Sequence, residues 1–357
     1  MSGVKIALDA MGGDSGPETV IAGIARAHHR WPDARFVAYG DEARVRPCLE
    51  QHPELESCVE FVHTADVIGD EDKPMQAVRR GQNSSMGLAI QAVKKGHVQV
   101  AVSAGNTGAL MALSKIMLRT MEGIDRPALA TLIPTVKGES VMLDLGANVE
   151  ASEENLVQFA VMGAAYARAV LGLERPRVGL LNVGVEELKG HSIVKNAGAI
   201  LRNTDLAMEF AGYVEGNGLS SGEVDVIVTD GFTGNVAIKT AEGTVKLIRS
   251  LLRDELIKSW VNKIAYLMVK GSLKSLGKHL DPNNHNGGVF LGLNGLIVKS
   301  HGNASDKGIA TAIGVAIDMA RNDLTTLIAE DLRNSGEIEK TIEKENTTET
   351  KTAAASE

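Results

Sequence analysis

Short apolar runs alternate along this chain with amphipathic stretches of helical periodicity, and this alternation restricts the fold more than any other feature. The runs interpreted as strands are rich in apolar and β-branched residues, and they cover residues 4–8, 35–39, 59–62, 98–102, 128–133, 141–145, 177–182, 224–229 and 295–299. Many of them are apolar on both faces, which is typical of strands that are covered by helices on both sides. The pattern predicts a three-layer αβα, Rossmann-like fold with a mostly parallel sheet.

The absence of internal repeats and the composition of the last residues predict how the chain is divided. No internal repeat is visible, so we expect a single α/β catalytic domain over residues 1–334. Residues 335–357 are rich in Glu, Lys and Thr, which predicts a disordered tail.

Residues 249–280 depart from the strand–helix alternation and are expected to form a protruding helical excursion. Between residues 249 and 279 there are seven Arg or Lys residues against one Asp and one Glu. Apolar residues recur there at helical spacing, namely Leu256, Ile257, Trp260, Val261, Ile264, Leu267 and Met268. We interpret the segment as a basic amphipathic helix, or as a helix pair broken near Gly271. Two roles stay open: a core or dimer helix, and an element that contacts anionic lipid or an acidic partner.

Composition excludes several classes of function. A formal net charge of −8 and only 3% aromatic residues do not fit nucleic-acid binding, which needs a basic surface and stacking side chains. Cys48 and Cys58 stand apart from any Cys or His cluster, so we expect free thiols and no metal site. We find neither a signal peptide nor an apolar run of about 18 residues, which favours a cytoplasmic protein that does not span a membrane.

Two glycine-rich loops after predicted strands suggest anion binding. Backbone N–H groups in such loops can approach a phosphate, and the N-terminus of a following helix adds positive charge. The candidate substrate- or phosphate-binding residues are Asp9, Gly12, Gly13 and Asp14 in the first loop, and Ser103, Gly105, Asn106, Thr107 and Gly108 in the second. Plain tight turns are the alternative. Neither loop has a GxGxxG or Walker A motif, so no nicotinamide or ATP site is expected.

Further strand ends carry candidate polar groups. Asp144 and Asn148 belong to the segment that ends the predicted strand 141–145 and are candidate binding residues, although a structural role is favoured for Asp144. Lys189 lies in a glycine-bounded loop, where its ammonium group would offset the charge of a phosphate or an oxyanion; a solvated loop lysine is the alternative. His301 ends the last predicted strand and is positioned to protonate a leaving group, but structural histidines are more frequent.

The sequence DGFTGN at residues 230–235 is the last of these loops. Its candidate binding residues are Asp230, Gly231, Thr233 and Gly234, and the amide of Asn235 can donate a hydrogen bond to a developing oxyanion. Capping of the next helix by Thr233 is the structural alternative. Because the carboxyl ends of parallel strands share one edge of a sheet, we expect all these loops to meet there. They would form an anion site without a metal ion, a serine-type triad or a nucleophilic cysteine.

The motifs DAMGGD, SAGNTGA, LDLGAN, Gly-x-Glu-Glu-x-Lys-Gly and VDVIVTDGFTGNVAIKTAEG resemble the signature blocks of bacterial phosphate acyltransferases. These are the acyl–acyl carrier protein:phosphate enzymes of phospholipid synthesis, and the resemblance extends in the same order over about residues 3 to 325. It implies a homodimer whose fold is similar to those of phosphotransacetylases and isopropylmalate-type dehydrogenases. It also implies that acyl carrier protein and inorganic phosphate are the substrates, that no cofactor takes part, and that a glycerol-3-phosphate acyltransferase consumes the acyl phosphate product.

The resemblance assigns catalysis to Lys189 and Asn235. Our hypothesis is that phosphate attacks the thioester carbonyl directly, because no nucleophile is placed for an acyl-enzyme. It further implies peripheral contact with the inner face of the cell membrane through a helical tip within residues 251–268. Residues 288–292 are bulkier than in the family, and residues 302–305 differ from it, which leaves acyl-chain preference and the role of the last loop open. The alternatives are a phosphotransacetylase that uses coenzyme A, a non-catalytic membrane-bound scaffold, and a nicotinamide dehydrogenase of the same fold.

Overall fold

A computed structural model describes residues 3–69, 72, 74–204, 206–279, 281–284 and 286–333 of the chain, so the tail expected at 335–357 lies outside the described residues. The strands are β1 (Lys5–Asp9), β2 (Arg35–Gly40), β3 (Val59–His63), β4 (Val100–Ser103), β5 (Ala128–Thr135), β6 (Gly138–Leu143), β7 (Arg177–Leu181), β8 (Glu209–Val214), β9 (Val226–Val228), β10 (Gly288–Leu291) and β11 (Leu296–Lys299). The helices are α1 (Gly16–Arg30), α2 (Glu42–Glu50), α3 (Pro74–Arg80), α4 (Ser85–Lys94), α5 (Thr107–Leu118), α6 (Glu153–Leu171), α7 (Ser192–Arg202), α8 (Gly231–Ile257), α9 (Trp260–His279) and α10 (Asp306–Arg321).

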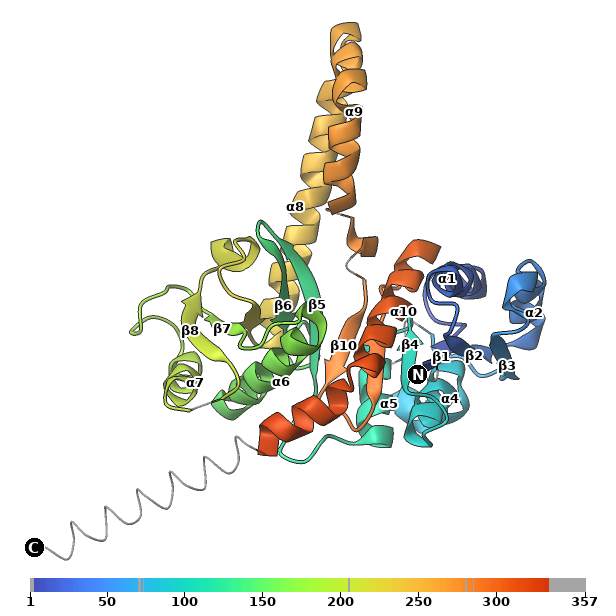
Figure 1. Ribbon diagram of the computed structural model, residues 1–357, viewed down its shortest axis with the longest axis horizontal. Helices are drawn as coiled ribbons and strands as arrows, with labels where there is room; N and C mark the ends of the chain where they lie inside the picture. The colour runs from blue at the N-terminus through green and yellow to red at the C-terminus, as the bar shows by residue number, and fades with distance from the viewer. Residues whose placement is uncertain are drawn as a thin grey trace, which may run out of the picture.

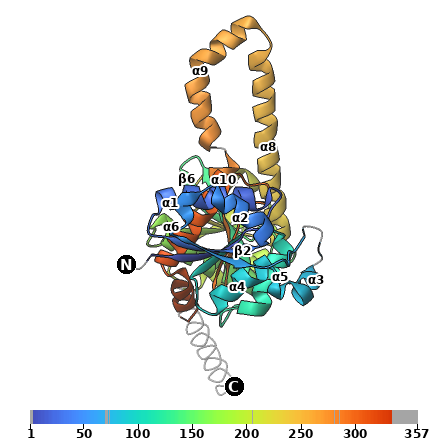
Figure 2. The ribbon, with the colours of Figure 1, turned by 90° about the vertical axis from the view of Figure 1, so that its right-hand side faces the viewer.

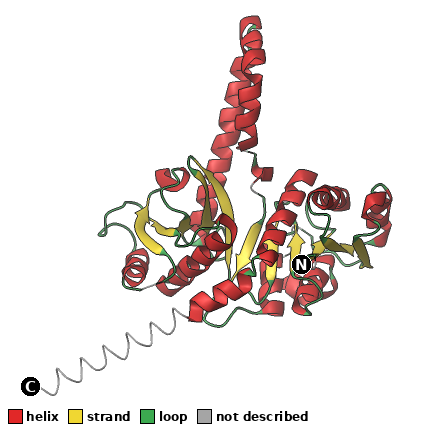
Figure 3. Ribbon diagram, viewed as in Figure 1, coloured by secondary structure: helices red, strands yellow, loops and turns green. Residues whose placement is uncertain are grey.

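The strands form one sheet in the order β3-β2-β1-β4-β11-β10-β5-β6-β9-β7-β8, and helices cover both of its faces (Figures 1 and 3). One apolar layer packs α1, α2, α6, α7 and α10 on the sheet and contains Phe159 and Tyr166. The other layer packs α4, α5 and the start of α8 on the opposite face and contains Met86 and Phe290. The predicted three-layer αβα, Rossmann-like arrangement is therefore confirmed.

Local sequence explains several helix ends. The side chains of Ser152 and Asn155 each accept a hydrogen bond from the other residue's backbone N–H, which forms a capping box at the start of α6. Gly172 ends the same helix at φ 68°, a left-handed conformation that favours glycine. Pro17 occupies the first turn of α1, where its missing N–H is not needed.

The sheet consists of two parallel blocks that run in opposite directions. One block contains β1, β2, β3, β4 and β11, and the other contains β6, β7, β8 and β9. Between them, β10 is antiparallel to both β11 and β5, and β5 is antiparallel to β6. The prediction of a mostly parallel sheet is confirmed, but the expectation that all polar loops share one edge is wrong. Three successive antiparallel pairs, β11–β10, β10–β5 and β5–β6, separate the blocks, so the two sets of loops leave from opposite edges.

Helices α8 and α9 form a hairpin that projects from the body of the protein (Figures 1 and 2). The chain turns at Lys258 and Ser259, and α9 then runs continuously through Gly271. The break expected near Gly271 is therefore wrong, because a glycine inside a helix costs only about 1 kcal/mol and does not by itself end it. In the described part of the chain, no helix is both long and apolar enough to cross a membrane.

Candidate active site

The loops after β1, β4 and β11 pack on one another and form a first polar cluster. The Ser103 hydroxyl donates to the Asp9 carboxylate at 2.7 Å, and the Gly105 N–H donates to the Ser103 oxygen at 3.1 Å. A Cβ at Gly12 would lie 2.6 Å from the Gly105 nitrogen, so only glycine fits this close approach. Asp9 is buried, and burial raises the pKa of its carboxyl. Asp9 and Ser103 therefore join the two loops.

The rest of this cluster is also occupied with internal contacts. The Asp14 N–H donates to the Gly302 carbonyl at 2.8 Å, which attaches the β1 loop to the β11 loop. The Asn106 side chain caps α5 by accepting a hydrogen bond from the Ala109 N–H at 2.9 Å. Thr107, the first residue of α5, faces the cavity described below.

The loops after β6 and β9 form a second cluster, in which α8 begins. The fully buried Asp144 carboxylate accepts hydrogen bonds from the backbone N–H groups of Leu129, Ala147 and Asn148 at 2.7–3.0 Å. The Asn148 side chain donates to Asp144 at 2.9 Å and to the Pro127 carbonyl at 2.8 Å. Burial raises the pKa of Asp144. These contacts support the structural role that was favoured for Asp144.

Glycines bring the first turn of α8 against this loop. The Gly231 N–H donates to the Asn148 carbonyl at 2.8 Å, and a Cβ at Gly234 would lie 2.0 Å from a backbone oxygen. Asp230 caps the helix, because its carboxylate accepts hydrogen bonds from the N–H and the hydroxyl of Thr233 at 2.8 and 2.7 Å. Capping by Thr233 is therefore wrong: Thr233 is the donor, since it lies at the third position of the helix rather than before it.

A cavity of about 540 Å³ connects the two clusters between α8 and the β5–β6 hairpin. Its size falls within the range of roughly 300–1,000 Å³ that is usual for small-molecule sites. Its lining contains polar and apolar residues, and comprises Thr107, Leu129, Thr131, Leu132, Ile133, Pro134, Met142, Leu145, Gly146, Leu219, Ser220, Asn235, Ala237, Ile238, Lys239, Ala241, Glu242, Val245, Lys246, Arg249, Asp281, Gly288, Lys299, Ser300 and His301.

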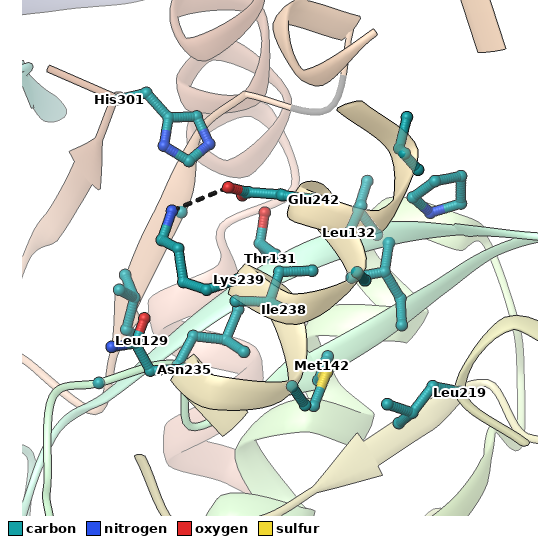
Figure 4. Close-up of a pocket in the computed structure, with 18 of the residues that line it drawn as sticks. Leu129, Thr131, Leu132, Met142, Leu219, Asn235, Ile238, Lys239, Glu242 and His301 are labelled. Carbon is teal, nitrogen blue, oxygen red and sulfur yellow. Dashed lines mark hydrogen bonds and ion pairs between the residues drawn. The ribbon is translucent and has the colours of Figure 1, made fainter. Parts of the chain in front are cut away.

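Figure 4 shows the division of this cavity. Asn235, Lys239 and His301 lie on one side of the view, and Leu132 and Leu219 lie on the other. The polar side therefore suits the reacting group of a substrate, and the apolar side suits an aliphatic chain.

The polar end is rich in lysine. Lys239 forms an ion pair with Glu242 at 3.0 Å, and the Lys299 ammonium group donates to the Ala104 carbonyl at 3.2 Å. Burial lowers the pKa of His301; Glu242 opposes this effect, and Lys239 and Lys299 are among the cations that add to it. The ring is thus favoured in its neutral form, which can accept or pass on a proton near neutral pH.

Lys189 lies outside the lining of the cavity. It is exposed on the loop after β7, where its ammonium group forms an ion pair with Glu186 at 2.8 Å. The ion pair raises the pKa of Lys189 and keeps it charged. This loop leaves from the same edge of the sheet as the connection from β9 to α8, the helix that carries Asn235, because β7 and β9 are parallel neighbours.

Of the residues predicted from sequence to form the site, the cavity brings together Thr107, Asn235 and His301. The others contribute to the two loop clusters or, like Lys189, lie elsewhere. Sequence reasoning missed the charged residues of α8 that line the cavity, which are Lys239, Glu242, Lys246 and Arg249. Their spacing of three and four residues was the available indication, because it places them on one face of a helix. In the described residues, no group of three His, Cys, Asp or Glu side chains is arranged to hold a metal ion.

The fold assigns the protein to a structural class. The structure is similar to a phosphotransacetylase from Streptococcus pyogenes, with a TM-score of 0.60 and 17% identity over 89% of this chain and 94% of that one. It is also similar to a 4-hydroxythreonine-4-phosphate dehydrogenase from Klebsiella pneumoniae, with a TM-score of 0.52 and 17% identity over 90% and 98%. At these identities the likeness shows the fold alone, which is the α/β architecture that phosphotransacetylases share with a dehydrogenase.

Sequence comparison then gives the family. Residues 4–327 match the model of a family described as fatty acid synthesis protein. The chain is 56% identical over 331 residues to the phosphate acyltransferase of Parvibaculum lavamentivorans, which covers 92% of each chain. It is 52% identical over 339 residues to the phosphate acyltransferase of Erythrobacter litoralis, covering 94% of this chain and 96% of that relative. The chain belongs to the phosphate acyltransferase family, and it is an enzyme of the acyltransferase class.

Proposed function

We propose that the protein transfers a fatty acyl group from the thioester of acyl carrier protein to inorganic phosphate and releases acyl phosphate. The observation that carries this proposal is the cavity, in which Asn235, Lys239 and His301 lie on one side and Leu132 and Leu219 lie on the other. An acyl thioester has the same polarity, since a reactive carbonyl is joined to an aliphatic chain. The relatives named phosphate acyltransferase support phosphate as the acceptor.

In the proposed reaction, a phosphate oxygen attacks the thioester carbonyl carbon and forms a C–O bond. The Asn235 amide donates a hydrogen bond to the tetrahedral oxyanion, and Lys189 offsets the negative charge from the loop after β7. Collapse of the intermediate breaks the C–S bond and releases the carrier thiolate. A thiol of this kind has a pKa of about 8.5, so the thiolate needs no strong acid and can be protonated by water. Of the glycine-rich loop residues expected to bind phosphate, Thr107 lines the cavity, so the start of α5 supports the phosphate side of the site.

The choice of acyl carrier protein as donor is supported by charge. Lys246 and Arg249 line the cavity, and Arg253 follows on the same helix. A basic surface of this kind steers an acidic protein partner. The donor is tested by comparing kcat/KM for acyl carrier protein and coenzyme A thioesters with the same acyl chain. A preference for the carrier protein is expected, and a preference for coenzyme A would favour a phosphotransacetylase.

We also propose a homodimer that contacts the inner face of the cytoplasmic membrane and supplies acyl phosphate to a glycerol-3-phosphate acyltransferase. The hairpin supports association, because Leu247 and Leu251 of α8 are each 58% exposed. At its tip, Trp260 and Met268 are 74% and 83% exposed, which supports membrane contact.

Three of the proposed tip residues differ from this pattern of exposure or cannot be assigned. Leu256 is half-buried, and the side chains of Val261 and Ile264 lie outside the described part of the structure. Ile257 and Leu267, like Trp260 and Met268, are exposed.

A further inference from the structure

One face of α8 carries a row of polar side chains along the cavity. Asn235, Lys239, Glu242, Lys246 and Arg249 all line it, and they follow one another at intervals of four and three residues. This interval repeats on one side of an α-helix, so the five side chains face the same space. The row therefore offers several cations to a substrate, at different distances from Asn235.

These cations differ in their distance from Asn235. A helix rises about 1.5 Å per residue, so Lys239 lies roughly 6 Å along the axis from Asn235, and Lys246 lies roughly 16 Å from it. In the proposed reaction the attacking phosphate bonds to the carbon whose oxygen faces Asn235, so it must sit within one helical turn of that residue. Lys239 satisfies this requirement, whereas Lys246 does not.

Other groups at the polar end also favour the binding of an anion next to Lys239. Thr107 lines the cavity at the first turn of α5, where unpaired backbone N–H groups and the helix dipole favour negative charge. The side chain of Lys239 is 57% exposed and is paired with Glu242, which is only 22% exposed. Lys299 is in contrast bonded to the backbone carbonyls of Ala104 and Ser300. The Lys239 ammonium group is thus the cation best placed to meet a small anion.

We propose that Lys239 binds inorganic phosphate beside Asn235, and that phosphate displaces the Glu242 carboxylate from Lys239 when it binds. This inference rests on the proposed function, because it assigns the phosphate subsite of that reaction. Lys189 lies outside the cavity lining. Lys239 is a second proposed cation, and it lies within the cavity.

The test compares Lys239→Met with Lys246→Met, which changes the same kind of residue on the same helix face. Loss of a charged hydrogen bond is expected to raise the phosphate KM of Lys239→Met by about tenfold or more. The KM for the acyl donor should stay unchanged in Lys239→Met. Lys246→Met should raise the KM for acyl carrier protein, which this lysine is proposed to steer, and should keep the wild-type phosphate KM. Lys239→Arg retains the charge and should recover most of the phosphate affinity. An unchanged phosphate KM in Lys239→Met would overturn the proposal.

Glu242→Gln is expected to change the phosphate KM in the opposite direction to Lys239→Met. It removes a carboxylate that competes with phosphate for Lys239, so the phosphate KM should fall. A rise would show that phosphate does not displace Glu242.

Calorimetric titration of folded Lys239→Met with inorganic phosphate tests the assignment if turnover is too slow to measure. Lost phosphate binding supports the assignment of Lys239, and retained binding overturns it. If wild-type protein makes no acyl phosphate, the proposed function fails; if it does and Lys239→Met keeps its phosphate KM, only the assignment of Lys239 fails.

Discussion

Gly234 lies against the backbone of Asp144, so closely that a Cβ at position 234 would come within 2.0 Å of the Asp144 carbonyl oxygen. This contact joins the first turn of α8 to the loop after β6. It also sets the next residue, Asn235, beside Gly146 at the end of the cavity. Because the neighbouring atom belongs to the backbone, it cannot turn aside as a flexible side chain can. The position of Asn235 therefore depends on glycine at 234.

Gly234→Ala is expected to lower the free energy of unfolding by about 1–3 kcal/mol, which is usual for overpacking at a rigid contact. Gly243→Ala is the matched control, because it lies on the same helix and a Cβ there would meet nothing within 4 Å. That control should gain up to about 1 kcal/mol from the higher helix propensity of alanine. Urea denaturation measures both variants. Equal stability of the two would show that the Gly234 contact is not tight.

Asn235→Ala is expected to lower kcat by about 10²–10³-fold, which is the usual effect of removing one oxyanion donor. The KM for the acyl donor should change little, because the hydrogen bond is proposed to strengthen in the transition state. Asn203→Ala, at an exposed position at the end of α7, serves as the control and should keep wild-type turnover. Steady-state kinetics at saturating phosphate measure the difference. A kcat within a few-fold of wild type in Asn235→Ala would remove Asn235 from the mechanism.

The pKa of His301 should respond to its charged neighbours. Burial lowers this pKa, Glu242 opposes the effect, and Lys239, Lys299 and Lys246 add to it. Protonation adds a positive charge that Glu242 attracts and Lys239 repels. Glu242→Gln should therefore lower the pKa of the ring further, and Lys239→Met should raise it. NMR titration of the imidazole resonances, assigned with His301→Asn, measures both shifts, and shifts of the reverse sign would contradict this account of the polar end.

The hairpin tip should bind anionic vesicles through its exposed apolar side chains. Replacing Trp260 and Leu267 by serine removes apolar area at the tip and should reduce co-sedimentation with phosphatidylglycerol vesicles. Leu276→Ser is the control, since Leu276 is 51% exposed on the same helix but lies farther from the tip. Equal loss of binding in both variants would argue against a role specific to the tip.

Much of the fold could be predicted from sequence, because alternation of helices with runs that are apolar on both faces is typical of a sheet that helices cover on both sides. The opposite directions of the two parallel blocks of strands could not be predicted. The direction reverses at the β5–β6 pair, because β10, a four-residue strand at Gly288–Leu291, is antiparallel to both β11 and β5 and so leaves these two strands running the same way. Periodicity in so short a segment does not distinguish a strand from a loop, nor a parallel strand from an antiparallel one.

The site was predictable where it depends on local sequence. Asn235 and His301 follow strands in polar, glycine-rich loops, and both line the cavity. Lys239 and Glu242 were missed because charged residues inside a helix usually form a solvated face. What brings them into a site is the β5–β6 hairpin, which lies across that face from a distant part of the sequence.

The most direct test of the proposed function is the formation of acyl phosphate by the purified protein. Wild type and Asn235→Ala would each be incubated with a long-chain acyl carrier protein thioester and ³²P-labelled inorganic phosphate, and the lipid-soluble label would be counted. The account predicts phosphate-dependent labelled acyl phosphate with wild type, and a rate about 10²–10³-fold lower with Asn235→Ala. Absence of labelled product with wild-type protein, or equal rates for the two proteins, would contradict it.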